Sequence, residues 1–310
     1  QLRNFTPQRS GELRLYQAVR EAVPVVDAAV CKLIRLSGGV KVLCDDLETQ
    51  TALRTFLERV NAGRGQHGIE AFLSQYLDSL LVYGGAVGEM VPAAGNRTLA
   101  ALLCGRLEQV ELREGESPLD FRICGPDEHG SMAELPYQEL LLFTPLHPEA
   151  AHPYGVSMLR GIPFMADILM KIYHTIGVNW ERCGNVRFAV TCRDSEGSAA
   201  QRGQVLAQEW SRAMQETRSG DVRDLVAVGD VDIRVIGADA PVLDSQVPVR
   251  QVMEQIVAKT GIPPFMLGLN WNSTERMSAQ QADMLTTEIT ALRRTLTPVV
   301  EKICRMWLRM

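Results

Sequence analysis

The sequence predicts an α+β protein whose helices lie toward both ends of the chain, with short strands between them. Near both ends, apolar residues recur every three or four positions, which is the period of an amphipathic helix. Between residues 85 and 145 the apolar segments are short or alternating, and Gly, Pro, Asn and Asp separate them. With 310 residues, of which 46% are hydrophobic, the chain can bury a core and is long enough for about two domains.

The N-terminal region is predicted to be helical. Apolar residues have helical spacing over residues 13–34, and Pro24 should kink or divide this segment because its ring removes an N–H donor. A short strand is expected at residues 40–44, followed by helices at about residues 47–60 and 69–83.

The glycine-rich stretch YGGAVGEM should form the corner where helix gives way to strand. A phosphate-binding loop is the alternative, but the stretch precedes a strand and lacks the P-loop lysine, so a structural corner is favoured. Strands are then predicted at five segments: AVGEMV, LAALLC, QVELRE, DFRIC and ELLLF.

A helix is predicted over residues 158–182, because six apolar residues recur at helical spacing and form one stripe. These residues are Met165, Ile168, Leu169, Ile172, Ile176 and Trp180. Packing within or between subunits explains the stripe better than a ligand site does. Either Ser157 caps this helix and Pro163 kinks it, or the helix begins at Pro163; the sequence leaves both alternatives open.

A small unit is predicted between residues 186 and 236. It comprises the strand VRFAVTC, a polar helix around residues 198–217, and a hairpin whose two-residue turn is Gly229-Asp230. The next helix carries a second apolar stripe of five residues: Val249, Val252, Met253, Ile256 and Val257.

That helix should end abruptly. Gly261 suits the left-handed position that closes a helix, and Pro263-Pro264 cannot continue one. The three apolar residues that follow, 265–267, are expected to anchor the chain in a core, and residues 270–277 are polar enough for an exposed loop.

A long amphipathic helix is predicted over residues 279–310, with Ser278 and Gln281 as its capping box. Eight residues define its apolar stripe: Met284, Leu285, Ile289, Leu292, Leu296, Val300, Ile303 and Trp307. Pro298 should bend it.

Composition argues against several classes of protein. A formal charge of −5 disfavours a protein that grips nucleic acid over its whole surface. Seven scattered cysteines, an odd number without a CxxC pair, favour reduced thiols over a disulfide framework or a zinc site. No signal peptide or membrane-spanning apolar run occurs, so a soluble protein without a membrane partner is expected.

No group of residues has the pattern of a catalytic or metal site. His147 and His152 lie in a proline-rich loop without a further ligand nearby, and Ser157 lacks the second glycine of a nucleophile elbow. The acidic pairs Asp45-Asp46 and Asp127-Glu128 are expected in solvated turns. We therefore predict no enzyme activity, no cofactor and no metal.

Two motifs resemble the portal proteins of tailed bacteriophages, which form the ring at one capsid vertex. HPYGVSMLRG is similar to the Tyr-Gly-x-Ser sequence that leads into the first stem helix of that family. IVAKTGIPPFMLG is similar to its signature Ile-Ala-x-x-x-Gly-(Val/Ile)-Pro-Pro-x-x-Leu-Gly. The segments AVPVVDAAVCKLIRL and LVYGGAVGEM resemble the opening helix of the portal wing and its glycine-rich corner.

The resemblance implies a portal-type fold with its parts in a fixed order. Residues 1–156 and the C-terminal helix 279–310 would form the wing, residues 157–185 and 246–261 the antiparallel stem helices, and residues 186–245 the clip. Residues 262–278 would be an exit segment with a channel loop. The chain ends at Met310, so the crown is expected to be absent or truncated, and the N-terminal part is short.

The resemblance also implies a function and partners. The chain would form a homo-oligomeric ring of about twelve copies in the virion, assembled in the host cytoplasm. Double-stranded DNA would pass through its channel during packaging and ejection. Its protein partners would be the major capsid protein, the terminase large subunit, and a head-tail connector or adaptor.

The implied site residues fall into three groups. The channel-loop group is Asn270, Asn272, Ser273, Thr274, Glu275 and Arg276; the hinge group is Gly261, Pro263 and Pro264. The stem-packing group is the first stripe named above with Val252, Met253 and Ile256. Arg276 could contact DNA phosphate or pair with Glu275 of a neighbouring subunit. The alternative function is a structural scaffold protein of the virion or host that has no DNA channel.

Overall fold

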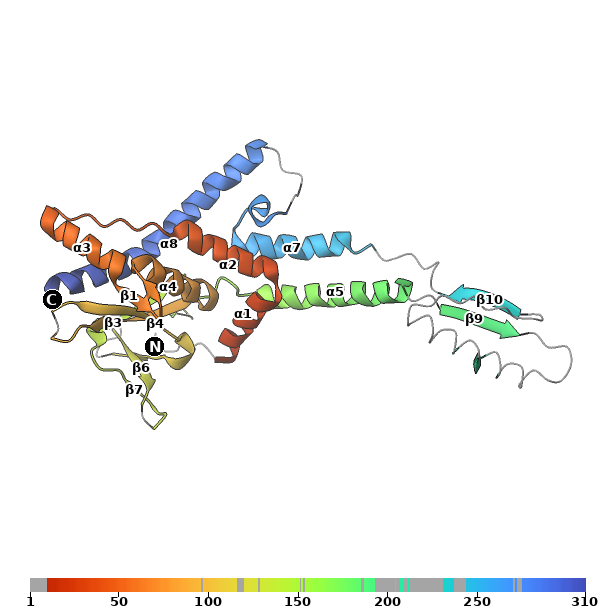
Figure 1. Ribbon diagram of the computed structural model, residues 1–310, viewed down its shortest axis with the longest axis horizontal. Coiled ribbons are helices and arrows are strands. Elements are labelled where there is room, and N and C mark those ends of the chain that lie inside the picture. Colours follow the sequence, from red (N-terminus) through yellow and green to blue (C-terminus); the bar gives the residue numbers. More distant parts are fainter. Residues whose placement is uncertain are drawn as a thin grey trace. The chain divides into compact units, whose positions relative to one another are not determined.

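The computed structural model has an α+β fold with a long C-terminal helix, as predicted (Figure 1). It describes residues 10–95, 97–115, 120–127, 129–150, 152, 154–184, 187–192, 204, 207–208, 211, 231–236, 244–269, 271 and 275–310. The chain divides into two compact units. The first comprises Gln1–Leu169 and Arg250–Met310, and the second Met170–Val249.

The helical predictions for the N-terminal region are confirmed. Helix α1 spans Ser10–Ala22 and α2 spans Pro24–Ser37, so Pro24 divides the segment and occupies the first turn of α2, where its missing N–H has no helical partner to lose. Helices α3 (Leu47–Arg59) and α4 (Ile69–Tyr83) follow. Asp46 caps α3, because its carboxylate accepts a hydrogen bond of 2.7 Å from the N–H of Thr49.

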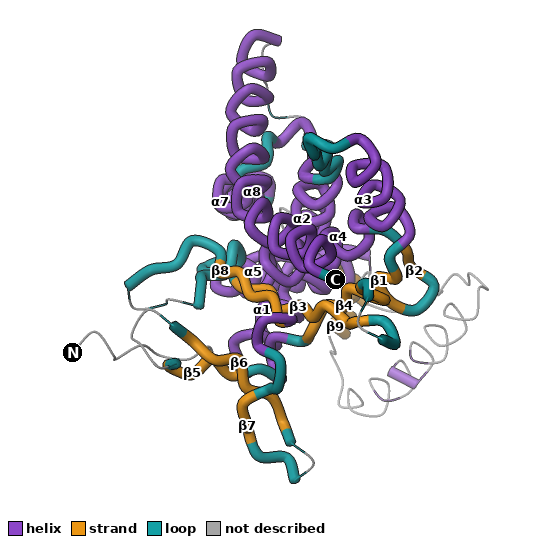
Figure 2. The backbone as a smooth tube through the Cα atoms, turned by 90° about the vertical axis from the view of Figure 1, so that its left-hand side faces the viewer, coloured by secondary structure: helices purple, strands orange, loops and turns teal. Residues whose placement is uncertain are grey.

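The first unit is built on a five-stranded sheet of order β2-β1-β4-β3-β8. Its strands are β1 (Asn61–Gly63), β2 (Gln66–His67), β3 (Gly85–Pro92), β4 (Leu99–Gly105) and β8 (Leu141–Pro145). Strand β3 pairs antiparallel with both β4 and β8. Helices α2, α3, α4 and α8 lie on one side of this sheet (Figure 2).

A second sheet of three antiparallel strands has the order β5-β6-β7. It comprises β5 (Glu111–Glu114), β6 (Phe121–Pro126) and β7 (Met132–Glu134). Two 3₁₀ turns flank it, η1 (Leu107–Gln109) and η2 (Gln138–Leu140). Five predicted strands are therefore confirmed, whereas β1, β2 and β7 are too short to show a period in the sequence.

The predicted strand at residues 40–44 is wrong. The segment has no strand partner within the described part of the chain. The carboxylate of Glu70 accepts hydrogen bonds from the N–H groups of Gly39 and Val40, the latter at 2.8 Å. Its alternating pattern arises because Val40, Val42 and Cys44 face the protein while Lys41 and Leu43 are exposed.

Two basic side chains of helix α8 (Glu275–Arg309) fix it to the first unit through hydrogen bonds to backbone carbonyls that are distant in sequence. The guanidinium of Arg293 donates to the carbonyls of Leu36, Ser37 and Gly38 at 3.0, 3.2 and 2.9 Å, which satisfies the end of α2. The ammonium of Lys302 donates to the carbonyl of Leu141 at 2.6 Å, and burial lowers its pKa. The helix continues through Pro298, and the bend expected there stays a prediction.

The remaining elements are α5 (Ile162–Gly184), β9 (Arg187–Cys192), β10 (Val231–Ile236), α7 (Gln246–Thr260) and the 3₁₀ turn η3 (Pro264–Leu267). Strands β9 and β10 pair antiparallel in the second unit. The Gly229-Asp230 turn and most of the predicted polar helix 198–217 lie outside the described residues.

Candidate functional site

The break after α7 has the predicted geometry. Gly261 is left-handed, with φ +69°, and its N–H donates to the carbonyl of Val257 at 3.1 Å. Pro263 and Pro264 then prevent further helix, and the chain turns into η3. Ile262 is 1% exposed and anchors the turn in the core. The hinge residues therefore lie together at the end of α7.

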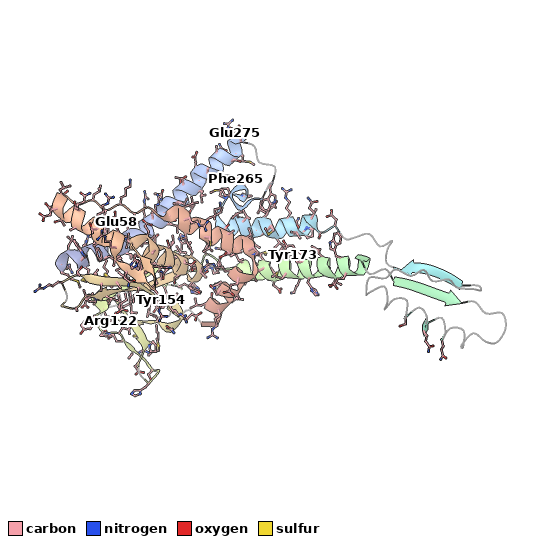
Figure 3. All side chains as sticks on the ribbon, viewed as in Figure 1. Glu58, Arg122, Tyr154, Tyr173, Phe265 and Glu275 are labelled. Carbon is pink, nitrogen blue, oxygen red and sulfur yellow. The ribbon has the colours of Figure 1, made fainter. Side chains whose placement is uncertain are left out.

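The expected anchor at residues 265–267 is wrong in one respect. Phe265 is 38% exposed, and Met266 and Leu267 are half-buried (Figure 3). The 3₁₀ turn is the reason, because its three-residue repeat cannot place three consecutive side chains on one buried face. Ile262, just before the prolines, supplies the buried contact instead.

Four of the six channel-loop residues, Asn270, Asn272, Ser273 and Thr274, lie outside the described residues. Glu275 and Arg276 are both exposed, but they form the first turn of α8 rather than a loop. The predicted capping box at Ser278 and Gln281 is therefore wrong, because the helix begins at Glu275. An acidic residue in the first turn stabilises a helix through its dipole.

The first ten residues of α8, 275–284, contain no buried side chain, and the first buried residue is Leu285. Met277 and Met284 are 43% and 72% exposed. Figure 1 shows this part of α8 extending away from the rest of the first unit, and Figure 3 labels Glu275 at its beginning. One contact beside this segment was not predicted: the guanidinium of Arg250 lies 5.9 Å from the ring centre of Trp271.

The residues of the two predicted stripes differ in burial. On α7, Val252 and Ile256 are buried and Met253 is half-buried. On the part of α5 that belongs to the first unit, Leu169 is buried and Met165 and Ile168 are half-buried. In the second unit Ile172 and Ile176 are half-buried, and Trp180 is 67% exposed.

The segment that leads into α5 is tied to the first unit by the residues of the Tyr-Gly-x-Ser motif. The hydroxyl of Tyr154 donates to the carbonyl of Leu112 at 2.9 Å. Gly155 lies against the backbone of Gly84, at the corner between α4 and β3. The hydroxyl of Ser157 donates to the carbonyl of Val82 at 2.5 Å and accepts from the N–H of Leu159 at 2.9 Å.

These contacts decide between the two beginnings offered for α5. The helix begins at Ile162 with Pro163 in its first turn, so the second alternative is confirmed to within one residue. Ser157 is 2% exposed and lies five residues before the helix, where it closes a turn instead of capping the helix. YGGAVGEM is confirmed as a structural corner, because Gly84 has φ +81° and ends α4.

The described residues include no group of three or more His, Cys, Asp or Glu side chains placed to hold a metal ion. Within the same residues Cys31, Cys44, Cys104, Cys124 and Cys304 are free thiols. Burial raises the pKa of Cys104 to about 12 and that of Cys304 to about 11, so both are protonated at neutral pH. None of the helices in the described part of the chain is long and apolar enough to span a membrane.

No family model matches this sequence, and no curated protein matches it in sequence. A chain in the neck of an empty gene transfer agent (GTA) particle, computed with C6 symmetry, matches the fold with TM-score 0.75 and 15% identity, over 99% of this chain and 84% of that chain. A chain in the neck of the native GTA particle, computed with C12 symmetry, matches with TM-score 0.74 and 14% identity, over 98% of this chain and 82% of that chain.

The crystal structure of an HK97 family phage portal protein from Corynebacterium diphtheriae also matches, with TM-score 0.48 and 10% identity, over 91% of this chain and 85% of that chain. The higher TM-scores of the two neck chains establish the fold over nearly the whole sequence. The chain therefore has the fold of a chain found in the neck of the GTA particle.

Proposed function

We propose that this chain is a portal protein: it forms a homo-oligomeric ring at one capsid vertex, through which double-stranded DNA is packaged and ejected. The observation that carries the proposal is the match of 98% of the chain with a chain of the native GTA neck, computed with C12 symmetry. The Tyr-Gly-x-Ser and Gly-Ile-Pro-Pro sequences support it, because both occupy structural turns beside α5 and α7. The role is structural, without catalysis.

The parts of the portal are proposed as follows. Residues 1–156 and α8 form the wing, and residues 157–185 and 246–261 form the stem helices. Residues 186–245 form the clip, which binds terminase and the head-tail connector. The segment 262–278 supplies the channel loop, and the capsid protein surrounds the ring. The exposed beginning of α8 supports this assignment, because ten residues without a buried side chain leave it open to solvent or to a partner.

The first prediction concerns assembly. The purified chain should form a closed ring of about twelve copies, because one repeated head-to-tail interface closes into a cyclic assembly. Mass photometry at micromolar concentration gives the copy number, and negative-stain images along the particle axis show whether a channel exists. A folded monomer at every concentration and salt tested would contradict the proposal. A closed particle without a channel would favour the scaffold alternative.

A portal channel must let a genome slide, so its wall should bind DNA weakly. Each phosphate that a basic side chain neutralises adds salt-dependent affinity and so resists sliding. The exposed Arg276 is the described residue of the channel-loop group that offers such a contact. The sequence contains no P-loop lysine motif, so ATP hydrolysis is assigned to a separate terminase.

The second prediction follows. Rings should bind duplex DNA with a Kd of about 1 µM or weaker at physiological salt, as nonspecific binding does. Arg276→Ala should reduce the dependence of log K on log salt without changing ring assembly, whereas Arg59→Ala, an exposed arginine at the end of α3, should leave that slope unchanged. Fluorescence anisotropy across a salt series measures both. Nanomolar, sequence-selective binding would overturn the channel assignment.

A further inference from the structure

The corner between β7 and β8, residues 134–139, presents a tyrosine in a backbone conformation that tyrosine rarely adopts. Tyr137 has φ 55° and ψ 53°, in the left-handed region, and is 69% exposed. A Cβ-bearing residue is strained there, and such strain persists only where the surrounding structure enforces it. The fold therefore holds an aromatic side chain outward at a cost in stability.

Gln138 enforces this conformation. Its Oε1 accepts a hydrogen bond of 2.9 Å from the N–H of Ile123, and its Nε2 donates to the carbonyls of Ile123 and Leu135 at 2.8 and 2.7 Å. The amide thus ties the corner to β6 on both sides of the tyrosine. A rigid, exposed aromatic residue with a polar tip is the kind of side chain that anchors protein interfaces.

A groove of about 480 Å³ lies elsewhere on the first unit, between residues 37–44, α3 and α8. Leu53, Leu296, Val300 and Cys304 line it and are buried. Leu43 and Leu308 also line this α3–α8 groove, and they are 84% and 51% exposed. Scattered exposed leucines need no explanation, but two on one concave apolar surface indicate a binding site.

The groove and the corner have complementary charge and hydrogen-bonding groups. The groove is lined by three basic residues, Lys41, Arg293 and Arg305, and one acidic residue, Glu301. Of these, Arg293 also donates to the carbonyls at the end of α2, and Arg305 lies 3.3 Å from Glu301. The corner carries Glu134 and Glu139 and no basic residue; Glu134 lies 3.6 Å from Arg122 of β6. The hydroxyl of Ser37, which lines the groove, is buried and has no hydrogen-bond partner among the described residues, and a phenol could supply one.

The two surfaces cannot meet within one chain. Thr295, Pro298, Val299 and Lys302 line a second groove beside Glu139, and none of them lines the α3–α8 groove. At 3.6 residues per turn these residues occupy the face of α8 opposite to Leu296, Val300 and Cys304. Figures 1 and 2 both show β7 and α3 on opposite sides of the first unit. Complementary surfaces on opposite sides are what a head-to-tail interface requires.

We propose that Tyr137 of one copy inserts into the α3–α8 groove of the next copy, with Glu134 and Glu139 facing the basic side chains of the groove. The proposal rests on the ring proposed above and names the contact that joins neighbouring wings. The proposed contact places charged side chains at the edge of the interface, so assembly should weaken as the salt concentration rises.

Photo-cross-linking tests the contact directly. With benzoylphenylalanine in place of Tyr137, irradiated rings should give covalent dimers and higher ladders, with the cross-linked peptide mapped to residues 37–44 or 293–308. The matched control replaces Phe164, which is 65% exposed on α5, and should give no cross-link to the groove. Cross-links from position 137 that map elsewhere, or none between copies, would overturn the proposal.

A mixing experiment tests the direction of the interface. Asn tolerates the left-handed conformation, so Tyr137→Asn removes the side chain without adding strain, and Leu308→Asp places a charge in the groove. Each variant alone should assemble at least tenfold more weakly than the wild type, with unchanged thermal stability of the monomer. Mixed, the two variants should form a dimer through the one intact corner and the one intact groove, and no ring.

The outcomes separate this inference from the ring itself. Wild-type rings that form while both tests fail would leave the portal proposal standing and refute the contact. Absence of any wild-type assembly would refute both. Equal assembly of the wild type and Tyr137→Asn would also refute the contact, whatever the ring looks like in images.

Discussion

Gly155→Ala should destabilise the protein by about 4 kcal/mol or more, which is rare for a single methyl group. Gly155 has φ +98°, so any side chain there incurs left-handed strain of roughly 1–2 kcal/mol. A Cβ would also overlap the carbonyl oxygen of Gly84 and lie 2.7 and 2.9 Å from the backbone N and O of Leu146. All of these are backbone atoms close to the corner between α4 and β3, so they cannot move aside as a flexible side chain would.

The matched control is Gly161→Ala, six residues further along the same segment. Gly161 has φ +90°, but a Cβ there meets no described atom within 4 Å, so only the strain of roughly 1–2 kcal/mol is expected. Thermal or urea unfolding of both variants separates strain from overlap. If the two variants lost equal stability, the close approach of Gly155 to Gly84 would not exist in solution.

This corner shows what the sequence could and could not predict. The glycine-rich YGGAVGEM is recognisable as a helix-to-strand corner because glycine next to an apolar run favours a turn. Its contact with Gly155 is not recognisable, because the two glycines are far apart in sequence and nothing local indicates that one approaches the other. The hydrogen bonds from Arg293 to the end of α2 cannot be recognised in the sequence either, because their three acceptors are backbone carbonyls, which every residue has.

Where the prediction from sequence was wrong or incomplete, the physical cause differs from element to element. Alternating apolar residues at 40–44 predict a strand, but the segment has no partner strand among the described residues. The alternation arises because the segment lines the α3–α8 groove with one side and exposes the other. Helix α8 begins at Glu275, before the predicted residue 279, because no member of its apolar stripe precedes Met284 and the first residues therefore show no apolar period. Tyr137 carried one weak signal, a Pro-Tyr pair between two glutamates, which says nothing about backbone strain.

Ser157→Ala should cost about 3 kcal/mol, because two buried groups lose their hydrogen bonds at roughly 1–3 kcal/mol each. The carbonyl of Val82 lies in the last turn of α4, where helical carbonyls lack a partner within the helix, and the hydroxyl of Ser157 supplies one at 2.5 Å. The N–H of Leu159 donates to the same oxygen at 2.9 Å. Val82 and Leu159 are both 0% exposed, so water does not replace the serine.

Ser74→Ala is the matched control. Ser74 lies on α4, the helix that contains Val82, and its hydroxyl also donates to a carbonyl, that of Glu70, at 2.8 Å. Ser74 is exposed, so water substitutes for its hydroxyl and the loss should stay within about 0.5 kcal/mol, as for ordinary surface changes. Unfolding of both variants in urea measures the difference. If Ser157→Ala loses much more unfolding free energy than Ser74→Ala, then Ser157 joins the end of α4 to the segment before α5. That role needs a buried hydroxyl but no catalytic base. Equal, small losses would show that the segment before α5 shifts to satisfy Val82 and Leu159 without it.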